Sequence, residues 1–190
     1  MPIIELPKII LASQSPRRAE ILNSVGWPFE KLVADIDESV RDGESPEDYV
    51  VRLAIEKAKA VASQNKGTVL GADTTVVIDG EIIGKPVDLD DAVRMIAMLS
   101  GRWHEVITGV AFADGDDVVS GRQSTRVKFA EMTASEIAFL AHRGDPLDKA
   151  GAYAVQAQAA LFIEGIEGDY WNVVGLPISL VYRLAARLSE

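Results

Sequence analysis

The sequence predicts an α/β protein built on a mixed β-sheet. Short apolar runs, which are typical of buried strands, alternate with helical patterns along the 190 residues. Asp79-Gly80 is a tight-turn signal between two of these runs, so at least one strand pair is expected to be an antiparallel hairpin. Apolar residues make up 48% and charged residues 25% of the chain, a composition typical of folded globular proteins.

The first half of the chain carries two clear helix starts. Pro16 is suited to the first position of a helix, where its missing N–H has no partner to lose. Ser45 and Pro46 combine an N-cap with the same first-position proline, and two acidic residues follow them. The expected elements, in order, are a strand over residues 8–12, a helix from 16 to about 26, a strand over 29–34, a helix over 45–63, a strand over 68–72 that residues 74–78 extend, and a strand over 81–83.

The second half continues the alternation. Asp88 is a suitable cap for a helix that ends before Gly101, and Thr133 with Glu136 matches a capping box. The expected elements, in order, are a helix over residues 89–99, strands over 106–113 and 118–129, a short helix ending before 144, a strand over 160–166 and a helix over 178–188.

Composition excludes several classes of function. The formal net charge of −10 argues against general binding to nucleic acid or to an anionic membrane. The absence of cysteine excludes disulfides and Cys-ligated zinc, and two histidines are too few for a histidine-rich metal site, so any metal would be Mg²⁺ or Mn²⁺ on carboxylates. We see no signal peptide and no apolar run of about 18 residues, and expect a cytoplasmic protein without a membrane span.

Residues 13–18, Ser-Gln-Ser-Pro-Arg-Arg, are the most informative stretch for function. They join an apolar strand to a helix, and the free N–H groups of a helix N-terminus attract anions. Arg17 and Arg18 oppose the helix dipole there, which makes sense if a phosphate lies between them and the helix. Ser13 and Ser15 add hydroxyl groups. The alternative is an ordinary N-cap followed by two solvated arginines.

Asp73 is the strongest candidate for catalysis. It follows Gly71-Ala72 at the end of an apolar strand, where α/β proteins place their chemistry, and a carboxylate among apolar residues needs a strong partner such as a metal. Asp35, Asp37 and Glu38 follow another strand and could share a divalent cation with it. The alternatives are a carboxylate that binds its own backbone and an exposed acidic loop.

Three further side chains could meet a nucleotide. Lys57 and Lys85 could bind phosphate oxygens, although a lone helical lysine is most often solvated. Gln156 follows a run of small and polar residues and could recognise a base edge through its paired donor and acceptor. The alternative for residues 145–156 is a structured loop in which Asp148 and Lys149 merely pair.

Taken together, these stretches resemble the Maf family of nucleoside triphosphate pyrophosphatases. Eight matches in order run nearly from end to end of the chain. They are Leu11–Arg18, Val51–Ala54 with Lys57-Ala58, Gly71–Thr74, Gly84–Pro86, Leu99–Gly101, Thr108–Val110, Asp148–Tyr153 and Val173–Pro177.

The resemblance implies one domain over residues 1–190, with an elongated twisted mixed sheet, flanking helices and two lobes around a central cleft. It also implies metal-dependent cleavage of a nucleoside triphosphate to the monophosphate and pyrophosphate. Asp73 corresponds to the family's catalytic base and, with Glu38, to its metal ligands. The residues expected to bind substrate are Ser13, Ser15, Arg17, Arg18, Lys57, Thr74, Lys85 and Gln156.

Three positions bear on the base. Arg17, Thr74 and Gln156 resemble the branch of the family that prefers dTTP and UTP, whereas the 7-methyl-GTP branch has Trp after Ser-Pro and Glu in place of the glutamine. Ala157–Ala159 departs from the glycine that relatives often carry, which leaves base preference less certain than reaction type. Other open alternatives are a nucleotide-binding regulator of cell division without hydrolysis and a different phosphohydrolase or kinase. A homodimer is expected only at the level of the family.

Overall fold

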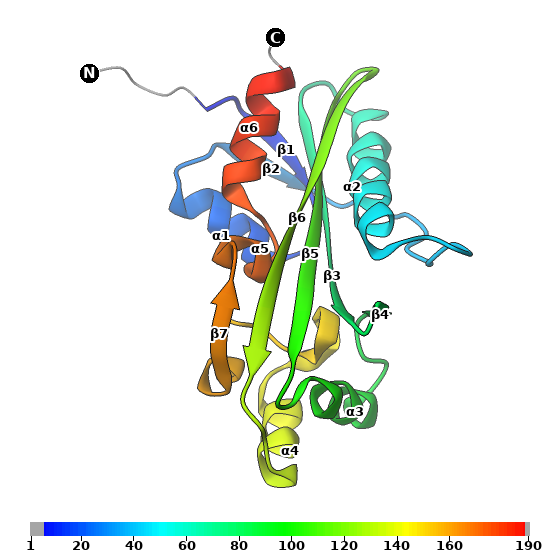
Figure 1. Ribbon diagram of the computed structural model, residues 1–190. Helices are drawn as coiled ribbons and strands as arrows, with labels where there is room; N and C mark the ends of the chain where they lie inside the picture. Colours follow the sequence, from blue (N-terminus) through cyan, green and yellow to red (C-terminus); the bar gives the residue numbers. More distant parts are fainter. Residues whose placement is uncertain (1–5, 189–190) are drawn as a thin grey trace. The chain divides into compact units, whose positions relative to one another are not determined.

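The computed structural model describes residues 6–188 (Figure 1). A seven-stranded sheet has the order β2-β1-β3-β5-β6-β7, and β4 pairs with β3. The strands are β1 (Ile9–Ala12), β2 (Phe29–Leu32), β3 (Val69–Ile78), β4 (Glu81–Ile83), β5 (Trp103–Asp114), β6 (Asp117–Phe129) and β7 (Ile163–Glu167). The helices are α1 (Pro16–Ser24), α2 (Pro46–Ala62), α3 (Leu89–Leu99), α4 (Ala134–Arg143), α5 (Tyr170–Val174) and α6 (Ile178–Leu188), with short 3₁₀ helices between α4 and β7.

The chain divides into two compact units. Unit 1 comprises Met1–Asp73, Thr108–Arg122 and Gly175–Glu190, and unit 2 comprises Thr74–Ile107 and Gln123–Val174. The three long strands β3, β5 and β6 contribute residues to both units.

In unit 1, β1 pairs in parallel with β2 and with β3. Parallel strands are buried on both faces, which explains why β1 reads as a continuous apolar run in the sequence. The core between α2 and these strands is built mainly from small side chains. Its buried members are Ala12, Ala54, Ala58, Val61, Val69, Ala111 and Ala113.

Helix α2 lies unusually close to the sheet at two glycines of unit 1. A Cβ atom on Gly71 would lie 2.1 Å from the carbonyl oxygen of Ala54, and one on Gly109 would lie 2.1 Å from that of Val50. Only glycine fits where two backbones approach this closely. This packing fixes the height of α2 above β3, which matters because both elements carry side chains of the candidate site.

Unit 2 holds the β3–β4 hairpin, helices α3 to α5 and the antiparallel pair β6–β7. Its core includes three rings packed edge to face, with centroids 4.9–5.4 Å apart, from His104, Phe129 and Tyr153. Such aromatic contacts add to the burial of the rings and hold the loop that carries Tyr153 against the sheet.

The structure confirms the mixed sheet and most expected helix boundaries. Ser45 and Asp88 cap their helices through side-chain hydrogen bonds to backbone N–H groups. Thr133 and Glu136 form both bonds of the capping box. Local hydrogen bonds of this kind depend on residues three positions apart, so the sequence alone predicts them well.

Several strand predictions were wrong in their bounds. Strand β2 ends at Leu32 rather than at residue 34, and β5 begins at Trp103 rather than at 106. Strand β7 begins at Ile163 rather than at 160, because the alanines before it form a 3₁₀ turn in which Ala160 N donates to Ala157 O. Residues 69–78 form one continuous β3, as the expected extension by residues 74–78 implies, so Asp73 lies within the strand and not at its end. The β-branched residues that follow Asp73 favour continued extension.

Among residues 6–188, no helix has both the length and the apolar character that crossing a membrane requires.

Candidate functional site

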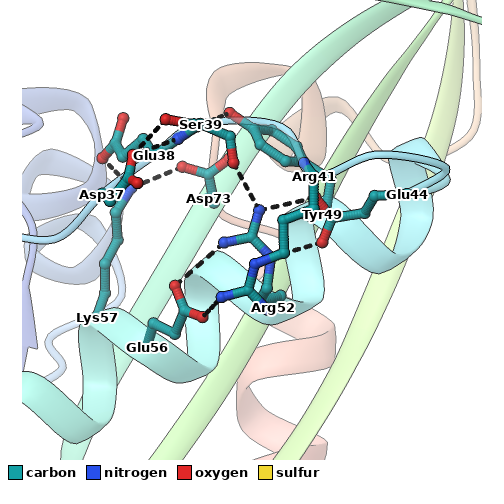
Figure 2. A network of polar contacts seen from close by, with 10 residues as sticks. All are labelled: Asp37, Glu38, Ser39, Arg41, Glu44, Tyr49, Arg52, Glu56, Lys57 and Asp73. Atoms are coloured by element: carbon teal, nitrogen blue, oxygen red, sulfur yellow. Dashed lines mark hydrogen bonds and ion pairs between the residues drawn. The ribbon is translucent and has the colours of Figure 1, made fainter.

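Two carboxylates and one ammonium group meet in unit 1. Asp73 on β3 and Lys57 on α2 are each 8% exposed, and Lys57 Nζ lies 2.6 Å from Asp73 Oδ1. The same Nζ lies 2.6 Å from Glu38 Oε1, which comes from the loop between β2 and α2 (Figure 2). Lys57 is therefore not the solvated helical lysine of the alternative interpretation, but a buried cation shared by two acids.

The surroundings of the Asp73 carboxyl change its pKa. Burial raises the pKa of Asp73, while the positive charges of Lys57 and Arg18 oppose that rise. A carboxyl with a raised pKa is a stronger base than an exposed aspartate, and perturbed groups of this kind cluster at functional sites.

Arg18 and Ser13 form a second buried group in unit 1. Arg18 Nε donates to Gly175 O at 2.9 Å, and its Nη1 donates to Ser13 Oγ at 3.0 Å. Burial lowers the pKa of Arg18, the charge of Asp73 opposes this, and the charge of Arg17 adds to the lowering. The positive charges of Arg17 and Arg18 repel each other, and Arg18 is also removed from water. A bound anion would offset both unfavourable effects.

The Ser15 hydroxyl does not cap α1. Ser15 is the N-cap residue, but its side chain makes no cap hydrogen bond, and its backbone N–H instead donates to Ser13 Oγ at 3.2 Å. The ordinary N-cap interpretation of this motif is therefore wrong for Ser15. The orphan N–H groups in the first turn of α1 receive no side-chain acceptor from Ser15.

A network of polar contacts, visible in Figure 2, connects α2 to the loop that carries Glu38. Arg52 donates to both oxygens of Glu44 at 2.5 and 2.7 Å, to Glu56 at 3.1 Å and to Ser39 O at 2.9 Å. Tyr49 donates from its hydroxyl to Glu38 O at 3.0 Å. No motif in the sequence indicates this network as a whole. Only the i,i+4 spacing of Arg52 and Glu56 was visible in the sequence, because the other partners lie across the loop.

The Arg52–Glu44 pair is partly shielded from water, with side-chain exposures of 13% and 9%. Hydrogen bonds from Arg52 lower the pKa of Glu44 from 4.5 to about 2. A carboxyl with a depressed folded-state pKa stabilises the fold above its unfolded pKa, and this stability disappears as pH falls through the folded value.

We predict that Glu44→Gln lowers the free energy of unfolding at pH 7 by about 1–3 kcal/mol, the range for hydrogen bonds to charged groups. The deficit relative to the parent should shrink as pH falls from about 4.5 to about 2, because the parent then loses the same charge. Urea unfolding at several pH values measures this. Glu167→Gln is the matched control, since Glu167 pairs with Arg126 but is 56% exposed, and its effect should be near zero.

Three predicted substrate residues belong to unit 2. Thr74 is half-buried on β3, Lys85 is exposed between β4 and α3, and Gln156 is exposed in a turn. The loops that carry Lys85 and Gln156 are joined within this unit, because Gly151 N donates to Gly84 O at 3.0 Å. A Cβ on Gly151 would lie 2.8 Å from a Val76 methyl, so the second loop also packs tightly on β3.

Two more features of this loop bear on its role. Lys149 pairs with Asp148 at 2.5 Å, as the simpler interpretation of the motif expected. His104 Nε2 lies 2.7 Å from the hydroxyl of Tyr153, three residues before Gln156, and no sequence signal pointed to this contact. Burial lowers the pKa of His104 to about 4, so the ring is neutral at neutral pH and anchors the loop without charge.

Glu38 and Asp73 are the carboxylates of unit 1 that could hold a divalent cation, because both contact the same atom, Lys57 Nζ, and therefore lie close together. Within residues 6–188 no cluster of three or more His, Cys, Asp or Glu side chains is arranged to hold a metal. Mg²⁺ is commonly bound through one or two carboxylates plus substrate phosphates and water, so two carboxylates suffice for it.

The chain is similar to known proteins over most of its length. The Maf-like protein family model matches residues 8–188. A dTTP/UTP pyrophosphatase of Symbiobacterium thermophilum is 48% identical over 174 residues, which cover 91% of this chain and 90% of that relative. One from Geotalea uraniireducens is 50% identical over 183 residues, covering 95% and 94% respectively.

Among solved structures, a HAM1 protein from Coxiella burnetii shares the fold. Its TM-score is 0.57 at 18% identity, and the match covers 97% of this chain and 99% of that one. The family model spans nearly the whole chain and the relatives are close to half identical, so the chain belongs to the Maf family.

Proposed function

We propose that this protein is a nucleoside triphosphate pyrophosphatase that hydrolyses dTTP and UTP to the monophosphate and diphosphate. Relatives of about 48–50% identity over most of the chain are named for this activity. The observation that carries the proposal is the cluster in which the buried Lys57 joins the partly exposed Glu38 to the buried Asp73, with the charge of Arg18 also acting on Asp73. Burying the charges of Lys57 and Asp73 is costly, and charged groups with perturbed pKa values are common at functional sites.

In unit 1 the proposal assigns triphosphate binding to the start of α1. Arg17 and Arg18 supply positive charge, and the N-terminus of α1 faces the ligand with its helix dipole. Ser13 Oγ already accepts from Arg18 and from Ser15 N, which leaves the Ser13 hydroxyl proton to meet a phosphate oxygen. Ser15 offers a second hydroxyl.

Asp73 is the proposed general base. It takes a proton from the water that attacks the α-phosphorus, the bond from that phosphorus to the bridging oxygen breaks, and pyrophosphate leaves. Lys57 stabilises the charge that develops on the leaving group. Glu38 and Asp73 would hold a Mg²⁺ or Mn²⁺ ion, which when bound neutralises phosphate charge and lowers the pKa of a bound water.

In unit 2 the proposal assigns Lys85 to the phosphates and Thr74 and Gln156 to the base. The Gln156 amide can complement part of the donor and acceptor pattern of uracil or thymine. The hydrogen bond that joins the two loops supports this assignment, since it fixes the backbone on which Lys85 and Gln156 stand.

The decisive experiment is a panel of common and modified triphosphates with Mg²⁺ or Mn²⁺, with products identified by mass. Release of pyrophosphate from dTTP and UTP is the expected result. Release of orthophosphate would indicate a different phosphohydrolase. Tight binding without any product would favour a nucleotide-binding regulator, and preference for 7-methyl-GTP would assign the chain to another branch.

For the base, we predict that Gln156→Glu lowers the ratio of kcat/KM for UTP to that for GTP by about 10-fold. The reason is the loss of a hydrogen bond in the base site, for which about 1–3 kcal/mol is typical. Competition between the two nucleotides measures the ratio directly. Gln158→Glu makes the same charge change two residues further on and should leave the ratio unchanged.

We also predict the pH dependence of hydrolysis. Because burial raises the Asp73 pKa above 3.8, kcat/KM should fall on the acid side with an inflection above that value. Lys57 lowers this pKa, so Lys57→Met should move the inflection to higher pH. Lys59→Met, an exposed lysine on the same helix, should retain the parental profile. An unshifted profile in Lys57→Met would contradict the assignment of the base.

Several expectations stay predictions. The resemblance implies the elongated sheet with a central cleft, a single domain over residues 1–190 and a homodimer. Composition and charge predict a cytoplasmic location and the lack of binding to nucleic acid. The family match over residues 8–188 supports the single domain, because it spans both compact units.

A further inference from the structure

The backbone that carries Glu38 is held from one side by helix α2. Tyr49 binds the carbonyl oxygen of Glu38 at 3.0 Å, and Arg52, one helical turn later, binds the carbonyl oxygen of Ser39 at 2.9 Å. The guanidinium of Arg52 also lies 5.6 Å from the centre of the Tyr49 ring. Two consecutive carbonyl groups of the loop are therefore bound by two neighbouring side chains of the helix that also carries Lys57.

The far end of the loop is attached to the same arginine. Both Glu44 oxygens accept from Arg52, and Glu44 Oε2 also accepts from the backbone N–H of Arg41 at 3.1 Å. Arg41 reaches back to Glu56 on α2 at 2.9 Å. A planar guanidinium has five donors in a fixed arrangement, which is why one arginine can hold two carboxylates and a carbonyl together.

The Glu38 side chain is 45% exposed. Its ion pair with Lys57 alone would therefore leave the side chain free to adopt several rotamers. Asp37 Oδ1 accepts from Ser39 N at 2.9 Å and fixes the turn around Glu38. We call the contacts of Tyr49 and Arg52 with the loop backbone the cradle. Because the cradle fixes the backbone at Glu38, it places the Glu38 carboxylate at Lys57 Nζ, beside Asp73.

We propose that Arg52 and Tyr49 are positioning residues that place the Glu38 carboxylate for divalent-cation and triphosphate binding. Neither residue needs to touch the substrate. The inference rests on the proposed function in so far as Glu38 is taken as a metal ligand. Substituting a residue that orients a metal ligand without touching the metal typically lowers metal affinity by 10- to 100-fold.

The test uses the full chain and the variants Arg52→Met, Arg52→Lys and Tyr49→Phe. The first readout is backbone hydrogen exchange of residues 35–45 without metal or nucleotide, followed by mass spectrometry. Arg52→Met should exchange at least about 10-fold faster over this segment. Tyr49→Phe should accelerate exchange less, because it removes one hydrogen bond to the loop whereas Arg52→Met removes several. Arg94→Met is the matched control, since Arg94 pairs only locally with Asp91 on α3 and should leave residues 35–45 unchanged.

The second readout is the Mg²⁺ concentration that gives half-maximal dTTP hydrolysis. It should rise about 10-fold in Arg52→Met, while kcat at saturating Mg²⁺ falls much less. Arg52→Lys should recover only part of the loss, because an ammonium cannot reproduce the two-pronged contact with Glu44 and the bond to Ser39. Near-UV circular dichroism and the melting temperature confirm that each variant is folded, and Tyr49→Phe carries the test if Arg52→Met is not.

Unchanged exchange of residues 35–45 would overturn the proposal, and so would a fall in kcat with an unaltered Mg²⁺ requirement. Failure of the proposed function gives a different result. The parent protein would then release no pyrophosphate, while hydrogen exchange would still report whether the cradle holds the loop.

Discussion

Asp73→Asn is expected to lower kcat for dTTP and UTP hydrolysis by about 100-fold or more. The substitution keeps the size and shape of the side chain but removes the proton acceptor and one negative charge next to Lys57. Loss of a general base typically costs 10²- to 10⁴-fold. Initial rates of pyrophosphate release at saturating nucleotide and Mg²⁺ measure the effect.

The fold should survive this substitution. An amide has the size of the carboxyl it replaces, and the buried Lys57 keeps its ion pair with Glu38 when Asp73 is substituted. The melting temperature of the variant should therefore stay near that of the parent, which separates lost chemistry from lost structure.

Asp79→Asn is the matched control for Asp73→Asn. Asp79 is an exposed hairpin residue with a positive φ of 54°, a conformation that asparagine tolerates well. Its kcat should equal that of the parent. Near-full turnover in Asp73→Asn would refute the assigned base, because no other change at this position preserves the shape so closely.

Gly109→Ala should cause a large loss of stability in unit 1. The new methyl group would lie 2.1 Å from the carbonyl oxygen of Val50 and 2.7 Å from the N of Val51, and both are backbone atoms of α2. Side chains can rotate away from such a contact, but a helix backbone can only move as a whole. Overpacking typically costs 1–3 kcal/mol, and we expect about 3 kcal/mol or more here.

Urea unfolding of Gly109→Ala measures that loss, and Gly121→Ala is its control. A Cβ on Gly121, on β6, would meet side-chain methyl groups, of Leu180 at 3.3 Å and of Leu184 at 3.7 Å, so the change in the free energy of unfolding should be small. Activity gives a second comparison. Because α2 carries Lys57, Arg52 and Tyr49, its displacement in Gly109→Ala should also reduce hydrolysis in the fraction that remains folded. Equal stability of the two variants would contradict the observed helix–sheet contact.

The sequence by itself determined the elements and the candidates for chemistry. The caps at Ser45 and Asp88, the capping box at Thr133 and the hairpin at Asp79-Gly80 all rest on residues within a few positions of one another. Such interactions are local, so periodicity and turn chemistry are sufficient to predict them. Ser13, Arg18, Glu38, Lys57 and Asp73 were likewise chosen from short motifs, before any contact among them was known.

The contacts that give these residues their roles came only from the tertiary structure. In the sequence, Lys57 is indistinguishable from a surface lysine of a helix. In the structure, α2 approaches β3 closely at Gly71, and Lys57 lies between Glu38 and Asp73. Arg18 binds Gly175, 157 positions away, and Arg52 gathers partners from a loop and a helix. Burial and the pairing of charges across long sequence separations depend on how the sheet and helices pack, and no local pattern of residues encodes that packing.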